Sequence, residues 1–191
     1  MSAFFVTGLP CSRTAWLANW LTTDRSFCHH DLLGRVAGLG EYQKAMSQRP
    51  RTGDADSGLL ACYSQVREIW PSAPWVLVRR DFDDAWQSLC RFVESGPWSD
   101  KLPLTWEVEQ RMRADWERAV ADLSRLPQVM AVSYEALDDS DTLERVWKHL
   151  LPGHWFDRKR TEALQTLRVQ VFQAKAPARP PMTLIGELVK G

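Results

Sequence analysis

The alternation of hydrophobic and polar positions along the chain predicts short strands and amphipathic helices that follow one another. Compact runs of apolar, β-favouring residues predict strands at 4–7, 26–31, 75–78 and 129–133. Apolar residues three and four positions apart predict helices at 16–21, 59–69, 81–95, 105–126, 141–151 and 158–167, with a weaker helical pattern at 41–51. Strands that alternate with helices are typical of an α/β fold in which a mainly parallel sheet is flanked by helices in three layers. Ligands of such sheets bind beyond the carboxyl ends of the strands.

Segments rich in Gly, Pro and Asp divide these elements. The glycines of 31–40 predict a loop, and Thr52–Gly58 is predicted to be an irregular break whose acidic and hydroxyl residues cap the next helix. We expect a single domain over 1–173, followed by a Pro-rich tail or lid over 174–191.

Composition and charge narrow the functional classes. Of the 191 residues, 24 are Lys or Arg and 24 are Asp or Glu, so the net charge is zero and no broad basic surface for nucleic acid is expected. Any anion site must therefore be local. The four cysteines form no C-x-x-C pair, which argues against a metal site and a disulfide framework. The chain also has no signal-peptide pattern and no apolar run of membrane-spanning length, so we expect a soluble cytoplasmic protein that binds no membrane.

The first candidate site is the loop that joins the first predicted strand to the first helix. Its sequence from Gly8 runs through Leu9-Pro10-Cys11-Ser12-Arg13-Thr14. Backbone N–H groups that converge at the start of a helix bind anions, and the helix dipole adds partial positive charge. A Walker A loop is excluded, because Arg13-Thr14-Ala15 stands where that motif needs Gly-Lys-Ser/Thr. An ordinary strand-to-helix turn is the alternative.

A second candidate site follows the strand at 75–78. Arg80 stands at its carboxyl end, and Ser88 follows eight residues later in the next helix. A planar guanidinium can donate two parallel hydrogen bonds to one phosphate. Arg79 is the rival cation on the opposite face of the strand, and an ion pair of Arg80 with Asp81 or Asp84 is the structural alternative.

These two motifs, with a third, resemble the P-loop sulfotransferases that use 3′-phosphoadenosine 5′-phosphosulfate (PAPS). Residues 10–16 follow the family loop Pro-Lys/Arg-Ser-Gly-Thr-Thr-Trp at Pro, Ser, Thr and Trp. Arg80, Asp84 and Ser88 have the spacing of its 3′-phosphate motif, and 132–137 is similar to its later Tyr-Glu-Asp-Leu segment. The order and separation of the three motifs agree over residues 4–150.

The resemblance implies a nucleotide site made of these motifs. Its residues would be Pro10, Cys11, Ser12, Arg13, Thr14, Ala15, Trp16, Arg80, Ser88 and Tyr134. Ser12 and Thr14 would hold the 5′-phosphate, and Arg80 and Ser88 the 3′-phosphate. Trp16 would stack on adenine and Tyr134 would touch the base. The alternatives are a core tryptophan for Trp16 and a strand-end tyrosine with a satisfied hydroxyl for Tyr134.

The chain departs from the family pattern at two loop positions. Cys11 replaces the Lys or Arg that would contact the sulfuryl group, and Arg13 replaces a glycine whose backbone angles arginine resists. Transfer of a sulfuryl group needs positive charge near the moving oxygens. Arg13 is the candidate for that catalytic charge, and a solvated arginine is the alternative.

The general base of the family, a histidine, is also missing from its matching region, 54–57. The replacement candidates are His30, His29, Asp31 and Asp56. A neutral imidazole suits proton transfer near pH 7, and His30 lies closer to the ligand edge than His29, so His30 is the first choice. We read His149 and His154 as structural.

The sequence thus predicts a small, divergent sulfotransferase-like protein that binds PAPS or adenosine 3′,5′-bisphosphate (PAP) without a metal. It would transfer a sulfuryl group to a hydroxyl or amine of a small-molecule acceptor. The sequence identifies neither this acceptor nor the oligomeric state. One alternative is a nucleotide or small-molecule kinase with a divergent P-loop. The other is a catalytically inactive nucleotide-binding module, and the loss of Lys at position 11 favours this second alternative.

Overall fold

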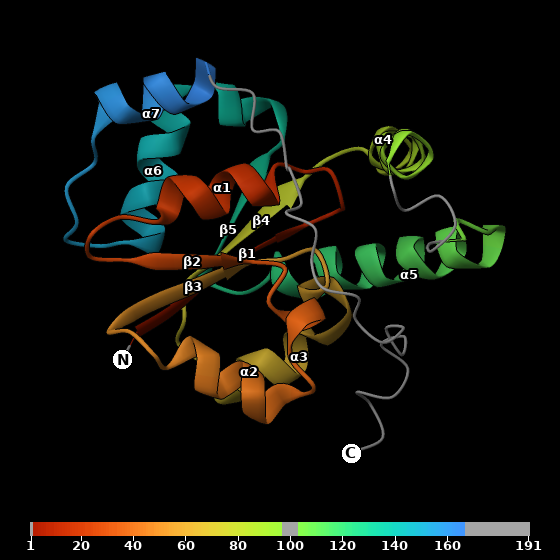
Figure 1. The fold of residues 1–191 in the computed structure, drawn as a ribbon, viewed down its shortest axis with the longest axis horizontal. Coiled ribbons are helices and arrows are strands. Elements are labelled where there is room, and N and C mark those ends of the chain that lie inside the picture. Colours follow the sequence, from red (N-terminus) through yellow and green to blue (C-terminus); the bar gives the residue numbers. More distant parts are fainter. Residues whose placement is uncertain (1, 97–102, 167–191) are drawn as a thin grey trace.

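A five-stranded, fully parallel sheet forms the centre of the molecule (Figure 1). The computed structural model describes residues 2–96 and 103–166. The strands lie in the order β2-β3-β1-β4-β5. Their bounds are Ser2–Gly8 for β1, Phe27–His30 for β2, Arg51–Ala55 for β3, Trp75–Arg79 for β4 and Val129–Ser133 for β5. The predicted α/β fold with a parallel sheet is therefore confirmed.

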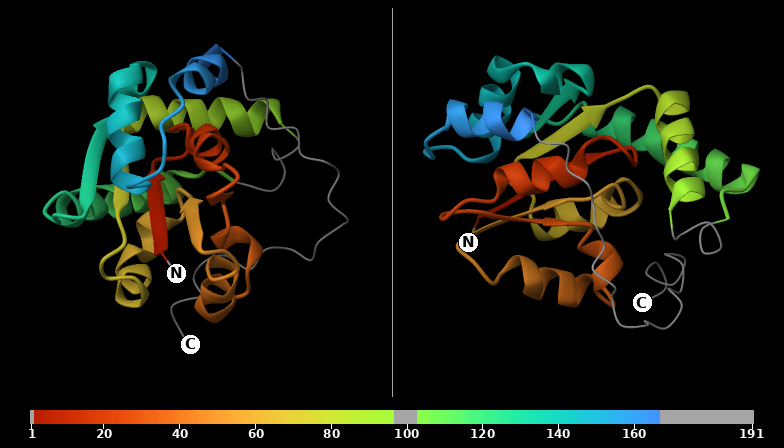
Figure 2. Two further views of the ribbon diagram at one scale, coloured as in Figure 1. Left: turned by 90° about the vertical axis from the view of Figure 1, so that its left-hand side faces the viewer. Right: turned by 45° about the horizontal axis from the view of Figure 1, so that its top comes forward.

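Helices cover both faces of this sheet, which makes three layers (Figures 1 and 2). One face carries α1 (Thr14–Leu21), α6 (Ser140–Leu150) and α7 (Arg158–Thr166). The other carries α2 (Leu39–Met46), α3 (Leu59–Ile69) and α5 (Trp106–Leu123). The remaining helix, α4 (Phe82–Ser95), follows β4 at the carboxyl edge, and two short 3₁₀ turns are η1 (Leu33–Arg35) and η2 (Glu135–Asp138).

Alternate residues of the central strands supply two separate hydrophobic cores. Phe4 and Val6 of β1 pack with α1 and α6, whereas Phe5 packs with Trp75 and the residues of α3 and α5. Strands that are buried on both faces need a nearly continuous apolar sequence. That requirement is why the apolar runs of β1 and β4 could be recognised.

The predicted break at Thr52–Gly58 is wrong over its first half, because Arg51–Ala55 is strand β3, between β1 and β2. Gly53 faces the Phe4 ring so closely that a Cβ there would lie 2.0 Å from a ring carbon. The buried carboxylate of Asp54 accepts a hydrogen bond from the Tyr42 hydroxyl at 2.8 Å. Gly and Asp lower β-propensity, but tertiary packing requires both residues here.

Smaller differences concern the ends of elements. Helix α2 begins at Leu39, inside the predicted loop at 31–40. His149 is structural as predicted, since its Nε2 atom lies 3.0 Å from the Trp75 carbonyl oxygen and 3.1 Å from that of Gln128. None of the helices in the described ranges has the length and apolar character that crossing a membrane would need. The predicted tail at 174–191 lies outside the described residues.

Candidate functional site

The loop between β1 and α1 has an unusual backbone. Cys11 has φ of 62° and Arg13 has φ of 64°, both in the left-handed region that favours glycine. An arginine in this conformation costs about 1 kcal/mol. Position 13, where the sequence motif expects glycine, thus keeps a glycine-like backbone although its side chain is large.

The loop also holds an unsatisfied polar group. Ser12 is fully buried, and its hydroxyl has no hydrogen-bond partner among the residues that the structure describes. Its backbone N–H donates to the Leu9 carbonyl at 3.2 Å, and α1 begins two residues later at Thr14. A buried hydroxyl without a partner is costly, so Ser12 fits a loop that closes around an anion at a helix N-terminus.

Arg80 connects this loop to α4. Its Nη2 atom donates to the Ser88 Oγ at 3.0 Å, and its Nη1 atom donates to the Cys11 carbonyl at 2.7 Å. The structure therefore brings together the arginine and the serine that the sequence paired by spacing. Asp81 instead caps α4 by accepting a hydrogen bond from the backbone N–H of Asp84 at 3.0 Å.

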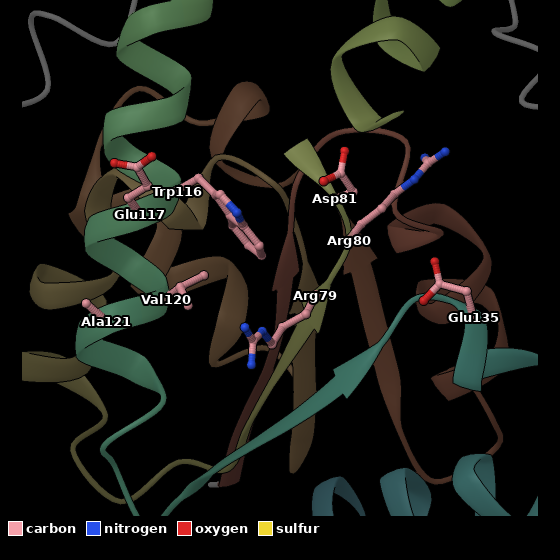
Figure 3. A pocket seen from close by; sticks show the side chains of 8 residues that line it. All are labelled: Arg79, Arg80, Asp81, Trp116, Glu117, Val120, Ala121 and Glu135. Atoms are coloured by element: carbon pink, nitrogen blue, oxygen red, sulfur yellow. The ribbon is translucent and has the colours of Figure 1, made fainter. Parts of the chain in front are cut away.

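The two neighbouring arginines point to opposite sides of β4 (Figure 3). Arg79 extends toward Val120 of α5, in a cavity of about 490 Å³ that Trp116 also lines. Arg80 extends away from α5 to reach the loop. Strand alternation is the cause, and it selects Arg80 as the arginine of the loop.

Tyr134 lies between the loop and the end of β5. The Cζ atom of Arg80 is 4.4 Å from the centroid of its ring, and that of Arg13 is 4.9 Å away. Arg13 also pairs with Asp138, with 2.6 Å between Nη1 and Oδ1. The guanidinium of Arg13 therefore faces Tyr134 and η2, and its expected catalytic role stays a prediction.

Trp16 occupies the contact between α1 and α7. Its ring stacks on Trp20 with 5.6 Å between centroids, and its Nε1 atom donates to the Leu164 carbonyl at 3.1 Å. This packing agrees with the alternative of a core tryptophan. Its expected contact with adenine stays a prediction.

His30 is the candidate base that lies against the loop. Its Nε2 atom is 3.4 Å from Thr14 Oγ1 and 3.3 Å from Asp31 Oδ2. Burial lowers the pKa of His30, while Asp56 raises it and Arg35 lowers it further. His29 lies on the opposite face of β2, where its ring packs edge-on against Phe27 at 4.7 Å between centroids.

Two carboxyl groups beside His30 have raised pKa values. Burial raises the pKa of Asp31 to about 6, against an opposing effect of Arg35. Burial and the charge of Asp31 raise the pKa of Asp56 to about 6. The Asp56 carboxylate accepts the backbone N–H of Gly58 at 2.7 Å and that of Leu33 at 3.0 Å, so it also fixes the neighbouring turns.

Sequence reasoning missed Asp138 and the carbonyl of Cys11, although each holds one of the site arginines. No sequence signal marks them, because η2 and the loop meet only in the folded chain. Within 2–96 and 103–166, no group of three or more His, Cys, Asp or Glu is placed to hold a metal ion.

Comparisons with known proteins relate the fold of the chain to solved structures. No protein-family model and no curated protein matches the chain. A mouse sulfotransferase, SULT7A1, solved in complex with PAP, superposes with a TM-score of 0.64 at 13% identity, over 86% of this chain and 63% of that enzyme. A sulfotransferase from Alicyclobacillus acidocaldarius superposes with a TM-score of 0.60 at 13% identity, over 90% of this chain and 87% of that protein. The chain thus spans less than two thirds of the mouse enzyme, and it has the sulfotransferase fold.

Proposed function

We propose that the chain binds PAPS and its product PAP at the carboxyl edge of the sheet. The observation that carries this proposal is the position of Arg80, whose guanidinium joins the Cys11 carbonyl of the loop to the Ser88 hydroxyl of α4. A phosphate bound beside them would accept hydrogen bonds from the Arg80 guanidinium and the Ser88 hydroxyl. The mouse neighbour, solved with PAP, supports the same choice of ligand.

The loop supplies the second phosphate position. The buried Ser12 hydroxyl, which has no partner within the described part of the chain, and the first N–H groups of α1 suit the 5′-phosphate. Tyr134, which lies close to Arg80, suits the base, and Trp16 would border it on α1. Two anion positions joined by Arg80 favour a nucleotide with phosphates at both the 3′ and the 5′ position.

The reaction we propose is transfer of a sulfuryl group to a hydroxyl or amine. PAPS supplies that group, and the chain would orient it on the loop and accept the proton of the acceptor. His30 and Asp56 are the candidate bases, since both lie beside the loop, whereas His29 packs on the other face of the sheet. Arg13 would contribute to nucleotide binding on the side of Tyr134, where Asp138 holds its guanidinium.

Two other functions are distinguished by simple measurements. A kinase with a divergent P-loop would bind ATP in a Mg²⁺-dependent manner, whereas a sulfotransferase binds PAP in the presence of a chelator. An inactive binding module would bind PAP but give no turnover of PAPS with any acceptor. Burial raises the pKa of the Cys11 thiol against the opposing effect of Arg80, and a thiol offers no positive charge. Cys11 therefore supports the alternative of an inactive binding module.

The experiment that tests the proposal is a thermal-shift series with PAP, AMP and ATP, each with Mg²⁺ and with chelator. A ligand that binds only the folded state raises the melting temperature by mass action. We expect the largest increase with PAP and no effect of the chelator. No increase with PAP, or a Mg²⁺-dependent increase with ATP alone, would refute the proposed function.

A further inference from the structure

Position 11 of the loop lacks the positive charge that the related loops place beside the transferred group. Position 11 carries a thiol. The guanidinium of Arg13 is paired with Asp138 at 2.6 Å, and that of Arg80, beside Ser88, is assigned to the 3′-phosphate. Moving oxygens in a group transfer nevertheless need cationic stabilisation.

His30 is the titratable side chain that meets the loop from β2. Its Nε2 atom lies 3.4 Å from Thr14 Oγ1, at the first residue of α1. The same nitrogen lies 3.3 Å from the carboxylate of Asp31. When the neutral ring carries its proton on Nδ1, Nε2 accepts a hydrogen bond from the Thr14 hydroxyl, and protonation then places an N–H at Nε2 on the side of the loop.

We propose that His30 is protonated when the nucleotide binds and that its imidazolium replaces the loop cation missing at position 11. This inference rests on the proposed nucleotide site and deepens it. The proton comes from solvent, and the bound anion and Asp31 stabilise it. His30 then donates its single Nε2 proton toward the anion, and the Thr14 hydroxyl, which no longer donates to Nε2, can donate to the ligand as well.

The groups around the imidazole decide when it takes up the proton. Asp56 favours the charged ring, and Arg35 opposes it. Asp31 faces the Nε2 atom from the turn after β2. Because burial lowers the pKa of His30 in the free protein, the ring is neutral at pH 7.5 until an anion arrives.

Protonation of His30 changes the assignment of the general base. An imidazolium cannot accept the proton of the acceptor in the same complex. The carboxylates of Asp31 and Asp56, with pKa values of about 6, are then the bases close to the loop. The histidine that the sequence favoured as a base becomes a ligand of the transferred group.

The test is calorimetric titration of PAP into wild type, His30→Gln and His29→Gln at pH 7.5, in two buffers of different ionisation enthalpy. Wild type and His29→Gln should take up roughly half a proton more than His30→Gln on binding at pH 7.5. Wild-type affinity should exceed that of His30→Gln by roughly tenfold at pH 6.5, and the difference should shrink by pH 8.5. The phosphates of PAP have a second pKa of about 6, so they are already mostly dianionic at pH 7.5 and take up few protons in any of the three proteins.

A second measurement, NMR titration of the histidine rings, compares wild type with and without PAP. The ring signals of labelled histidines in wild type report the pKa of His30, which should rise on addition of PAP. An unchanged or lower pKa, or equal proton uptake by wild type and His30→Gln, overturns the inference and leaves the nucleotide site intact. Absence of PAP binding to wild type refutes the proposed function itself.

Discussion

Arg80 and Ser88, eight residues apart in the sequence, are joined by a hydrogen bond of 3.0 Å across the start of α4. Ser88 Oγ also donates to the Asp84 carbonyl at 2.8 Å, so the hydroxyl is held at the side of the helix that faces the loop. If this pair binds the 3′-phosphate, Ser88→Ala should weaken PAP by roughly tenfold and leave AMP unchanged.

Ser95 gives a matched control on the same helix, because its hydroxyl bonds the Arg91 carbonyl at 2.7 Å in the same way. Calorimetric affinities of Ser88→Ala and Ser95→Ala for PAP and AMP check the prediction. Equal losses for the two nucleotides, or an equal loss in Ser95→Ala, would show that Ser88 acts only on the helix.

Arg13 offers a test that separates its backbone from its charge. Arg13→Gly removes the guanidinium and relieves the left-handed strain, whereas Arg13→Ala removes only the guanidinium. We expect Arg13→Gly to be more stable than Arg13→Ala by about 1 kcal/mol in chemical unfolding. Since the guanidinium faces Asp138 and Tyr134, both variants should lose nucleotide affinity with little change in kcat. The reverse result, a fall in kcat at unchanged affinity, would return Arg13 to the catalytic role expected from the sequence.

Gly53 should not tolerate even one methyl group. A Cβ would lie 2.0 Å from the ring of Phe4, which is itself fully buried, so Gly53→Ala should lower the unfolding free energy by about 1–3 kcal/mol. Gly40→Ala is the control, because nothing lies within 4 Å of its Cβ position and alanine favours the helix. Urea titration of the two variants checks the contrast, and equal stabilities would contradict the packing described for β3.

Asp31 should make stability depend on pH. Its pKa in the folded protein, about 6, is above the ordinary value of 3.8, so the folded state binds more protons than the unfolded state between these values. This group therefore favours folding most at low pH, and that contribution is lost as the pH rises from about 4 through 6. Asn suits the left-handed φ of 53° at this position, so Asp31→Asn keeps the turn without the titration.

The unfolding free energy of wild type, relative to Asp31→Asn, should thus fall between pH 4 and pH 7 and then stay level. Urea unfolding at intervals of half a pH unit measures the difference. A difference that rises with pH would mean that the carboxylate is stabilised, rather than disfavoured, in the folded protein.

The sequence predicted those parts of the fold and the candidate site that depend on local pattern. The apolar runs of β1 and β4 mark strands, and alternation along a strand separates Arg79 from Arg80 and His29 from His30. Strand β3 was missed because Gly53 and Asp54 are present for partners that come from elsewhere in the fold, Phe4 and Tyr42. The pairing of Arg13 with Asp138, 125 positions away, likewise follows from tertiary structure alone.

Arg80 is proposed to recognise a 3′-phosphate. The most direct test is the ratio of the dissociation constants of AMP and PAP, measured in wild type, Arg80→Met and Arg79→Met. Both nucleotides would bind their 5′-phosphate on the loop, so the ratio isolates the 3′-phosphate even if Arg80→Met disturbs the contact with Cys11. We predict a wild-type ratio of roughly tenfold to a hundredfold, preserved in Arg79→Met and close to one in Arg80→Met. A wild-type ratio near one, or a ratio lost in Arg79→Met and kept in Arg80→Met, would contradict the account.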